Sequence, residues 1–548
     1  MLRKMLKYYA FLGFGVAYAQ NDPHAGHQMS QMQPPPSQAA SQVFDPLQAD
    51  FSKLKDVSEP EIVDLTKVDV YELKATVVKQ TVGGKIFRRF AYNGSIPGPL
   101  FKVKQGHTAK IRFINETDVE TSIHSHGLRH SWKMDGQVPT SQPPVKPGES
   151  FLYELKFPDA GVFWYHPHIR EDYQQDMGLM GNFWVEPEVP THWNDVSRED
   201  VLMVDDMLAK APVAYPIDSA NHAIMGRFGD TMLVNGKESL KKEYRPGEVV
   251  RYFVTNAANT RTFRLKFSGA KMKLVGSDLS QFENELYVDH VTISPGERYI
   301  VEVQFPRNGK VTLENATPLG STGLVEFLAK GEPETRFKSS NIEKLRRNVK
   351  VTAELKKALE ESKKERTFSL KLDVAMASMQ GMDHSKMGHD MMDHSKMGHR
   401  PKAKLTKGRD VPWVPSADKV EWEDAMAAMN AASDTKMVKW KMTDQDKKEN
   451  MQANWILKKG SSYRVILENP KTGAHPMQHP IHFHGQRFFV DKVNGKKVHN
   501  RAWKDTVLVG LGDKVEIVLE ASNPGKWMAH CHIAEHLTSG MMTGFEVQ

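Results

Sequence analysis

A unit of turn and alternating strand occurs three times along this chain of 548 residues, and it constrains the fold more than any other feature. In each copy a glycine is followed nine residues later by an asparagine, with alternating apolar and polar residues between them. Further along, a second turn leads into another alternating stretch that ends at a proline. The first stretch spans 106–115, 247–256 and 460–469, and the second spans 146–158, 294–306 and 511–524. Such repeated units predict an all-β chain of three sandwich domains.

Cys531 is the only cysteine in the chain, so no internal disulfide can form. It stands between His530 and His532 and is followed by His536 and Met541. A thiolate, two imidazoles and a weakly held thioether are the ligands of a type 1 (blue) copper site, which transfers electrons. Three further His-x-His pairs occur in the chain: His124 and His126, His166 and His168, and His482 and His484.

Strand periodicity predicts which of these side chains share a face. Neighbouring side chains of an extended segment point to opposite faces. Cys531 should therefore point away from His530 and His532, so that a few covalent bonds would join two metal sites. His479 stands at odd spacing from His482. It should point toward the copper at Cys531, and we predict that it is the missing imidazole of that site.

Two other interpretations of these residues are weaker. A single His-x-His pair is most often two ordinary histidines, but four pairs with one around the only cysteine disfavour that explanation. Zinc accepts the same residue types. It gives no reason, however, to join a Cys-His-His-Met set to eight imidazoles, whereas electron transfer does.

The four motifs resemble those of the multicopper oxidases, the group that includes laccases, ascorbate oxidase and bacterial cuprous oxidases, in the family's order and over nearly the whole mature chain. The resemblance implies three cupredoxin-like Greek-key β-sandwich domains and four copper ions. It implies a type 1 copper at His479, Cys531 and His536 with Met541 as axial ligand, and a type 2 copper at His124 and His482. It also implies a type 3 pair at His126, His166, His168, His484, His530 and His532.

The second repeat lacks histidines where the other two carry them. Thr260 to Arg264 follow Asn256, and Val311 to Glu314 follow Pro306. We therefore expect domain 2 to bind no copper and to act as a spacer. The three-copper cluster should lie between domains 1 and 3, and the type 1 copper inside domain 3.

The resemblance also implies a mechanism. A donor near an exposed edge of His479 would give single electrons to the type 1 copper, and the cluster would reduce dioxygen to water with four. That reaction needs protons. Asp135 stands where the family carries an acid near the type 2 copper, although an Asp before a Gly is also a common turn. Leu537 replaces the Glu that many bacterial members carry, and Glu535 has the opposite strand parity.

The N-terminal residues indicate export, and the distribution of charge indicates a linker. Residues 1–19 have the basic, apolar and small-residue regions of a secretory signal peptide, with an uncleaved anchor as the alternative. No segment is long enough to span a membrane. The net charge of +7 is concentrated at 336–366, which carries eleven Lys/Arg against five Asp/Glu. We interpret this stretch as a partly helical linker, with contact to an anionic surface as the alternative, and expect no nucleic-acid binding.

Residues 376–451 contain twelve of the 28 methionines and an exact repeat of Met and His. Thioethers are soft ligands that suit Cu(I). The segment lies where cuprous oxidases and copper-resistance oxidases of the family carry theirs, although a disordered linker is the plain alternative. The candidate ligands for substrate Cu(I) are Met382, Met387, Met392 and Met397 in the repeat, and Met477 as the last relay to His479.

These observations divide the chain as follows: signal peptide 1–19, Met/His/Pro-rich tether 20–45, domain 1 at 46–190, domain 2 at 191–335, linker 336–365, and domain 3 at 366–548 with the partly helical Met-rich insert at about 376–451. We expect a monomeric periplasmic or secreted enzyme that oxidises Cu(I) with dioxygen. The alternatives are a laccase acting on phenols or other organic donors, and a copper-sequestering protein without turnover. The third repeat excludes a two-domain nitrite reductase.

Overall fold

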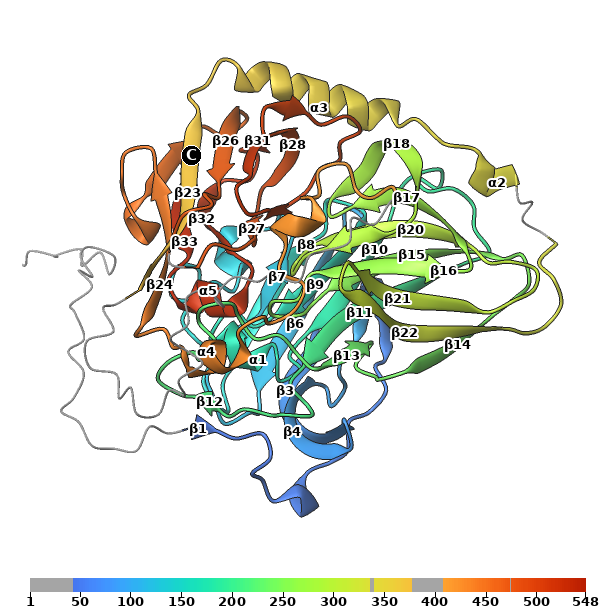
Figure 1. The fold of residues 1–548 in the computed structure, drawn as a ribbon, viewed down its shortest axis with the longest axis horizontal. Coiled ribbons are helices and arrows are strands. Elements are labelled where there is room, and N and C mark those ends of the chain that lie inside the picture. The colour runs from blue at the N-terminus through green and yellow to red at the C-terminus, as the bar shows by residue number, and fades with distance from the viewer. Residues whose placement is uncertain (1–42, 336–339, 377–407, 474) are drawn as a thin grey trace, which may run out of the picture. The chain divides into compact units, whose positions relative to one another are not determined.

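The computed structural model describes residues 43–335, 340–376, 408–473 and 475–548. The expected all-β architecture is confirmed, because each predicted domain consists of two packed β-sheets (Figure 1). The expected signal peptide and the repeat that carries Met382, Met387, Met392 and Met397 lie outside the described residues. In the described part of the chain, no helix is long and apolar enough to cross a membrane.

Domain 1 has a five-stranded and a four-stranded sheet. The first, in the order β2-β5-β10-β9-β7, contains β2 (Ile62–Asp64), β5 (Leu100–Lys104), β10 (Gly181–Glu186), β9 (Gly161–His166) and β7 (His124–His126). The second, in the order β4-β3-β6-β8, contains β4 (Lys85–Tyr92), β3 (Tyr71–Val82), β6 (Thr108–Asn115) and β8 (Ser150–Lys156). A short ribbon pairs β1 (Val43–Phe44) with β12 (Tyr215–Pro216).

Domain 2 repeats this arrangement with six and five strands. Its larger sheet has the order β13 (Thr231–Val234), β11 (Arg198–Met207), β15 (Val249–Asn256), β20 (Arg298–Gln304), β17 (Lys271–Ser277) and β18 (Ser280–Val288). The smaller sheet has the order β14 (Leu240–Tyr244), β22 (Gly320–Ala329), β21 (Val311–Thr317), β16 (Phe263–Ser268) and β19 (Val291–Ile293).

Domain 3 also has six and five strands. The larger sheet has the order β24 (Val438–Asp444), β23 (Phe368–Met376), β26 (Ser462–Glu468), β31 (Lys514–Glu520), β28 (Arg487–Val493) and β29 (Lys496–Lys497). The smaller sheet has the order β25 (Asn454–Leu457), β33 (Met542–Val547), β32 (Gly525–Cys531), β27 (His479–Phe483) and β30 (Thr506–Val509). β24 is therefore a strand of the domain 3 sheet, although the sequence placed it inside the insert.

The repeats seen in the sequence are structural neighbours. The two repeated stretches of each domain pair antiparallel: β6 with β8, β15 with β20, and β26 with β31. The histidine-bearing strands also pair, β7 with β9 and β27 with β32, and β16 with β21 is the corresponding pair in domain 2. The three copies thus present the same pair of strands, and only two of them carry histidines.

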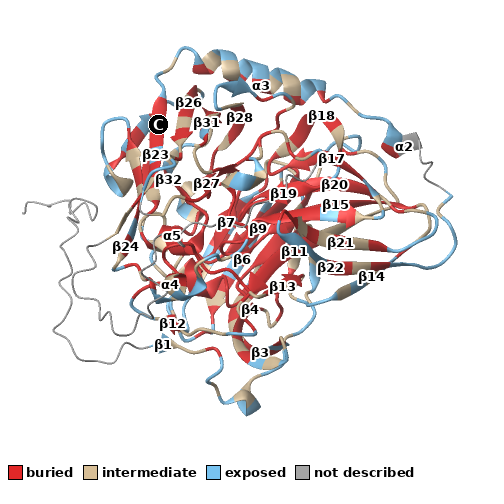
Figure 2. Ribbon diagram, viewed as in Figure 1, coloured by how far each residue is buried: buried red, intermediate tan, exposed pale blue. Residues whose placement is uncertain are grey.

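Helices are short except in the linker. α3 (Val349–Ser362) buries Val351, Leu355 and Ala358 at helical spacing and contacts both β18 and β26. Figure 2 shows its outer face exposed. The other α-helices are α1 (Glu171–Gln174), α2 (Ser340–Glu343), α4 (Ala427–Ala432) and α5 (Ala534–Thr538). The 3-10 helices among the described residues are η1 (Phe51–Lys53), η2 (Leu65–Lys67), η3 (Trp132–Met134), η6 (Ala417–Lys419) and η7 (Asn450–Gln452).

Candidate metal centres

The pairing of β27 with β32 sorts the candidate ligands onto two faces. Ile481 lies opposite Cys531, and His482 lies opposite His530. Residues that face each other across a sheet share a side, and so do residues two apart. His479 is thus on the same face as Cys531, and His482 is on the other face with His530. The parity predicted from the sequence is confirmed.

His479, Cys531 and His536 form a compact buried group. The Cys531 Sγ lies 3.7 Å from His479 Nδ1 and 3.8 Å from His536 Nδ1, so one ion could contact all three atoms. The Ile533 N–H points at the sulfur from 3.5 Å. Burial raises the pKa of the Cys531 thiol, so a metal must displace its proton to bind. A free reactive thiolate would need the opposite shift.

The two methionines expected near this group are both buried. Met541 is tied to it by its backbone, because its N–H donates to the His536 carbonyl and its carbonyl accepts from the Cys531 N–H, each at 3.0 Å. Met477 packs in the same hydrophobic core as Ile481, and its carbonyl accepts from the Asn469 side chain. Its packing explains its burial without a metal.

The expected exposed edge of His479 is absent. His479 is 1% exposed and His536 is fully buried. Trp440, on β24, stacks on His536 with ring centroids 4.0 Å apart and meets His479 edge-on at 4.9 Å. The prediction of an open edge was wrong because β24 belongs to the domain 3 sheet and brings its tryptophan over both rings.

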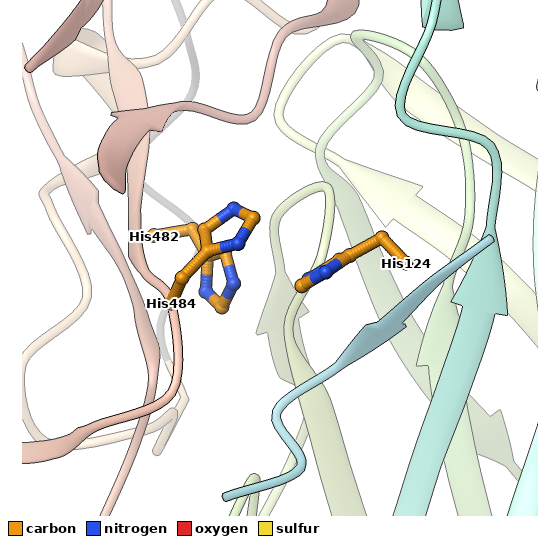
Figure 3. Close-up of side chains that lie close together, drawn as sticks. All are labelled: His124, His482 and His484. Carbon is orange, nitrogen blue, oxygen red and sulfur yellow. The ribbon is translucent and has the colours of Figure 1, made fainter. Parts of the chain in front are cut away.

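The other eight histidines gather where β7 and β9 of domain 1 face β27 and β32 of domain 3. Figure 3 shows His124 opposite His482 and His484. His126 and His482 stack with centroids 3.7 Å apart, and His124 and His484 lie 4.1 Å apart. The imidazole triplets able to share an ion are His124–His482–His484, His124–His126–His166 and His168–His484–His530. The His532 ring adjoins them, 5.0 Å from His126 and 5.4 Å from His166.

Most of these imidazoles present one free nitrogen to the middle of the group. The Nδ1 atoms of His124, His166, His482 and His530 face backbone carbonyl oxygens at 2.8 to 3.0 Å. An acceptor on one ring nitrogen fixes the proton there and leaves the lone pair of the other for a metal. The buried nitrogens without a partner are the Nε2 atoms of His124, His166, His168, His482 and His532, and Nδ1 of His126. Copper ions fit such a donor set.

Carboxylate oxygens also lie close to ring nitrogens of the group. Asp135 Oδ2 accepts from His484 Nδ1 at 2.8 Å, and its Oδ1 lies 3.3 Å from His124 Nδ1. Asp135 was predicted here, and the structure brings it against the cluster from the end of η3. Burial favours its neutral form, but His484 and His124 outweigh burial and hold the pKa of Asp135 well below its ordinary value.

Two carboxylates beside the cluster were missed by sequence reasoning. Glu171 Oε1 lies 3.1 Å from His168 Nδ1, and Asp505 Oδ1 lies 3.0 Å from His126 Nε2. Burial raises the pKa of Glu171 to about 8. Glu171 follows His168 by three residues, which was a usable signal. Asp505 is 379 residues from His126 in the sequence, so no residue spacing predicted this contact.

Glu535 is another buried acid, and it lies close to the group around Cys531. It lies on α5 beside His536, and its carboxylate faces Asn259 and Thr260 of domain 2 at 3.4 and 3.3 Å. Burial raises its pKa to about 8. The strand parity assigned to Glu535 from the sequence does not apply, because residues 534–538 are helical. Leu537 is buried on the same helix.

Burial also sets the charge of the imidazoles. It lowers the pKa of His168 and of His479 to about 3, and it lowers those of His126, His166, His484, His530, His532 and His536 well below their ordinary value. These rings are therefore neutral near pH 7, which is the state that binds a metal.

Comparison with known proteins agrees with this geometry. Family models described as multicopper oxidase match residues 75–190, 191–312 and 421–548. The multicopper oxidase mco of Staphylococcus aureus is 23% identical over 512 residues, covering 90% of this chain and 92% of its own. Copper resistance protein A of Escherichia coli is 24% identical, covering 83% and 89%. The crystal structure of a laccase from Pediococcus acidilactici superposes with a TM-score of 0.64 at 20% identity, covering 92% and 96%.

The three matched regions follow the order of the three β-sandwich domains and include all the histidine pairs and Cys531. Together with the two buried donor groups, they establish what kind of protein this is. The chain belongs to the multicopper oxidase family, and it is a copper-binding oxidoreductase that uses dioxygen.

Proposed function

We propose that this protein binds four copper ions and oxidises Cu(I) to Cu(II) outside the cytoplasm, in copper tolerance. In this assignment His479, Cys531 and His536 would hold a type 1 copper, with Met541 as a further ligand. His124 and His482 would hold a type 2 copper, and the remaining six imidazoles would hold a type 3 pair. Bound copper supplies one-electron transfer at the first site and the accumulation of electrons for dioxygen at the second.

The chain itself connects the two sites. Cys531 is bonded through the backbone to His530 and His532, which face the other side of β32. An electron that arrives at the sulfur therefore has a route of a few covalent bonds to the cluster. The burial of every ring along this route excludes water, which strengthens electrostatic interactions within it.

Asp135 is proposed to relay protons to the cluster. It contacts one imidazole of each domain, His124 and His484. Its carboxylate is buried against these two rings, so a proton that it carries would be delivered at the cluster. Its two oxygens would also help to fix the orientation of the His124 and His484 rings.

The observation that carries the choice of substrate is the burial of His479 and His536 beneath Trp440. A bulky aromatic donor gains electron contact most easily at an open imidazole edge, and no such edge is present here. A small ion passed between soft thioether ligands needs no open face. The sequence supplies such ligands in Met382, Met387, Met392 and Met397, and the relative from Escherichia coli is named for copper resistance.

The test replaces these four methionines by leucine, which keeps volume and apolarity but removes the soft ligand. We expect Cu(I) oxidation, measured as oxygen uptake, to fall several-fold while oxidation of a phenol stays unchanged. Removing residues 377–407 should lower Cu(I) oxidation similarly and leave phenol oxidation unchanged or raised. This deletion is narrower than the whole Met-rich segment, because residues 438–444 form β24.

Copper content separates the outcomes. A variant that keeps its copper but loses both activities in parallel would make the segment structural and remove the main support for Cu(I) as substrate. Unchanged Cu(I) oxidation in both variants would favour oxidation of organic donors. Fully loaded protein that takes up no oxygen with either substrate would indicate a sequestering role.

A further inference from the structure

The domain expected to be a spacer touches the cluster through the turn of residues 294–297. Gly296 has a positive φ of 82°, and a Cβ built there would lie 2.7 Å from His532 Cδ2. The equivalent glycine of domain 1, Gly148, has nothing within 4 Å, and that of domain 3, Gly512, faces the side chain of Lys471. Of the three copies of this turn, only the copy in the copper-free domain packs against a cluster imidazole.

Arg298 follows this turn and begins β20. Its two terminal nitrogens donate to the two carboxylate oxygens of Asp505, Nη1 to Oδ1 at 2.7 Å and Nη2 to Oδ2 at 2.6 Å. Its Nε donates to the Val162 carbonyl of domain 1 at 3.2 Å. The corresponding residues of the other repeats are Ser150 and Lys514, which are exposed. Arg298 and Asp505 have no exposed side-chain surface.

Asp505 transmits this contact to the two halves of the cluster. Its Oδ1 lies 3.0 Å from His126 Nε2 of domain 1 and 3.5 Å from His482 Nδ1 of domain 3. Thr506 Oγ1 contacts the same two nitrogens at 3.2 and 3.1 Å. An acceptor at His126 Nε2 places the proton there and leaves Nδ1, which has no partner, for a metal.

The residues around Arg298 and Asp505 pack closely against this ion pair. Gly127, directly after His126, has a positive φ of 85°, and a Cβ there would lie 2.5 Å from Arg298 Nη2 and 2.6 Å from Asp505 Oδ2. Lys504 pairs with Asp278 at 3.0 Å and with Glu297 at 3.1 Å, and all three are buried. Buried ion pairs contribute little net stability because desolvating the charges offsets their attraction. Such a network is better explained by the geometry that it imposes.

We propose that Arg298 is a positioning residue of the cluster. Domain 2 holds Asp505 with a two-point contact, and Asp505 fixes the orientation and tautomer of His126 and the orientation of His482. The copper-free domain is thus part of the cluster's support. This inference rests on the proposed assignment of His126 and His482 as copper ligands.

The test compares Arg298→Lys with Arg251→Lys. Lysine keeps the charge but cannot make the parallel two-point contact. Arg251 is the matched control, because it is a buried arginine of the same sheet, paired with Glu302 at 2.9 Å and with Glu199, and none of these three residues is a candidate copper ligand. Each variant is prepared as the full copper-loaded protein. The measurements are copper retention during dialysis against a chelator, the electron paramagnetic resonance signal of the type 2 copper, blue absorption and melting temperature.

We expect Arg298→Lys to retain cluster copper about 10- to 100-fold more weakly and to change the type 2 signal, because support residues contribute that much to metal affinity. Its blue absorption should persist, since Arg298 touches no atom of the His479–Cys531–His536 group. Arg251→Lys should lower the melting temperature while both copper signals stay as in the wild type. Asp505→Asn, which keeps the side-chain shape, should reproduce the change in the type 2 signal if Arg298→Lys fails to fold.

Two results overturn the proposal in different ways. Wild-type protein that binds no cluster copper would overturn the assignment and the inference together. Wild-type protein with a full cluster, beside Arg298→Lys or Asp505→Asn that keep its signal and its copper retention, would overturn the inference alone.

Discussion

The two candidate copper sites share strands but differ in what must fold to form them. The His479–Cys531–His536 group comes from β27, β32 and α5, all in domain 3. The eight-imidazole group takes two pairs from the opposite faces of the same strands and two from β7 and β9 of domain 1. One site needs the fold of a single domain, whereas the other also needs two domains to dock.

The difference extends to the groups that orient the ligands. In the His479–Cys531–His536 group, a backbone N–H points at the sulfur and the Trp440 ring packs on the two imidazoles. Around the shared site, carboxylates from each side cross the interface: Asp135 of domain 1 reaches His484, and Asp505 of domain 3 reaches His126. The shared site should therefore be more sensitive to changes in charge and pH, and the site within domain 3 to changes in its own ligands.

The largest effect should follow Cys531→Ser, which removes the ligand unique to the site in domain 3. We expect loss of the blue absorption and of nearly all turnover, because the covalent route from donor to cluster begins at this sulfur. Copper content should fall from four per chain to three, since no cluster ligand is altered. Retained blue colour would show that the type 1 assignment is wrong, and loss of all copper would show that the two sites are not separable.

Asp135→Asn should affect the shared site alone. The amide keeps the size of the carboxylate but cannot relay a proton, so reoxidation by dioxygen should slow by about 10- to 100-fold. Reduction of the type 1 copper by a fast donor should stay near normal, because Asp135 does not contact the site in domain 3. Stopped-flow absorption separates the two steps, and reoxidation at the wild-type rate would assign Asp135 to the turn instead.

The smallest predicted effect is the pH dependence of stability in the metal-free protein, where acid should destabilise the shared site more than the site in domain 3. The pKa of His168 and of His479 is lowered to about 3 by burial, below the value in an unfolded chain. Between about pH 6.5 and 3 the unfolded chain therefore binds more protons, and the free energy of unfolding falls as pH falls, by up to about 1.4 kcal/mol per pH unit for each such ring.

More of the imidazoles whose pKa is lowered lie between domains 1 and 3 than in the site within domain 3. The interface between these domains should therefore open first on acidification. Hydrogen exchange at pH 7 and pH 5 would detect this as loss of protection in β7 and β9 before β26 and β31. Copper-loaded protein is the control, because bound metal keeps the rings unprotonated and should flatten the pH dependence. Equal loss of protection in both regions would contradict the comparison.

Much of the site was predictable because its patterns are local. The His-x-His pairs and the odd spacing of His479 follow from the two-residue period of a strand, and β27 and β32 confirm both. The three Gly-to-Asn stretches became β6, β15 and β26 for the same reason. Asp135 was also found, because the resemblance to the multicopper oxidase family implies an acid at this position near the type 2 copper.

Other features gave no local signal. The segment with Trp440 is rich in Met and charge and reads as an insert, yet residues 438–444 pair with β23 across the sequence that separates them. Its tryptophan then buries the imidazoles that were expected to be exposed. Strand pairing between distant segments depends on the whole sheet, and composition does not reveal it.

The sequence by itself determined the three repeated β units and the strand faces on which His479, His482 and Cys531 lie, because both depend on short-range periodicity. Its motifs also gave the eleven candidate metal-ligating side chains and Met541, through their resemblance to the multicopper oxidase family. Only the tertiary structure decided that Trp440 covers His536 and that Arg298 holds Asp505, a contact between residues 207 positions apart. It also decided that Asp505 reaches His126. The Trp440 contact depends on the pairing of distant strands within domain 3, and the contacts of Arg298 and Asp505 depend on how the three domains pack together.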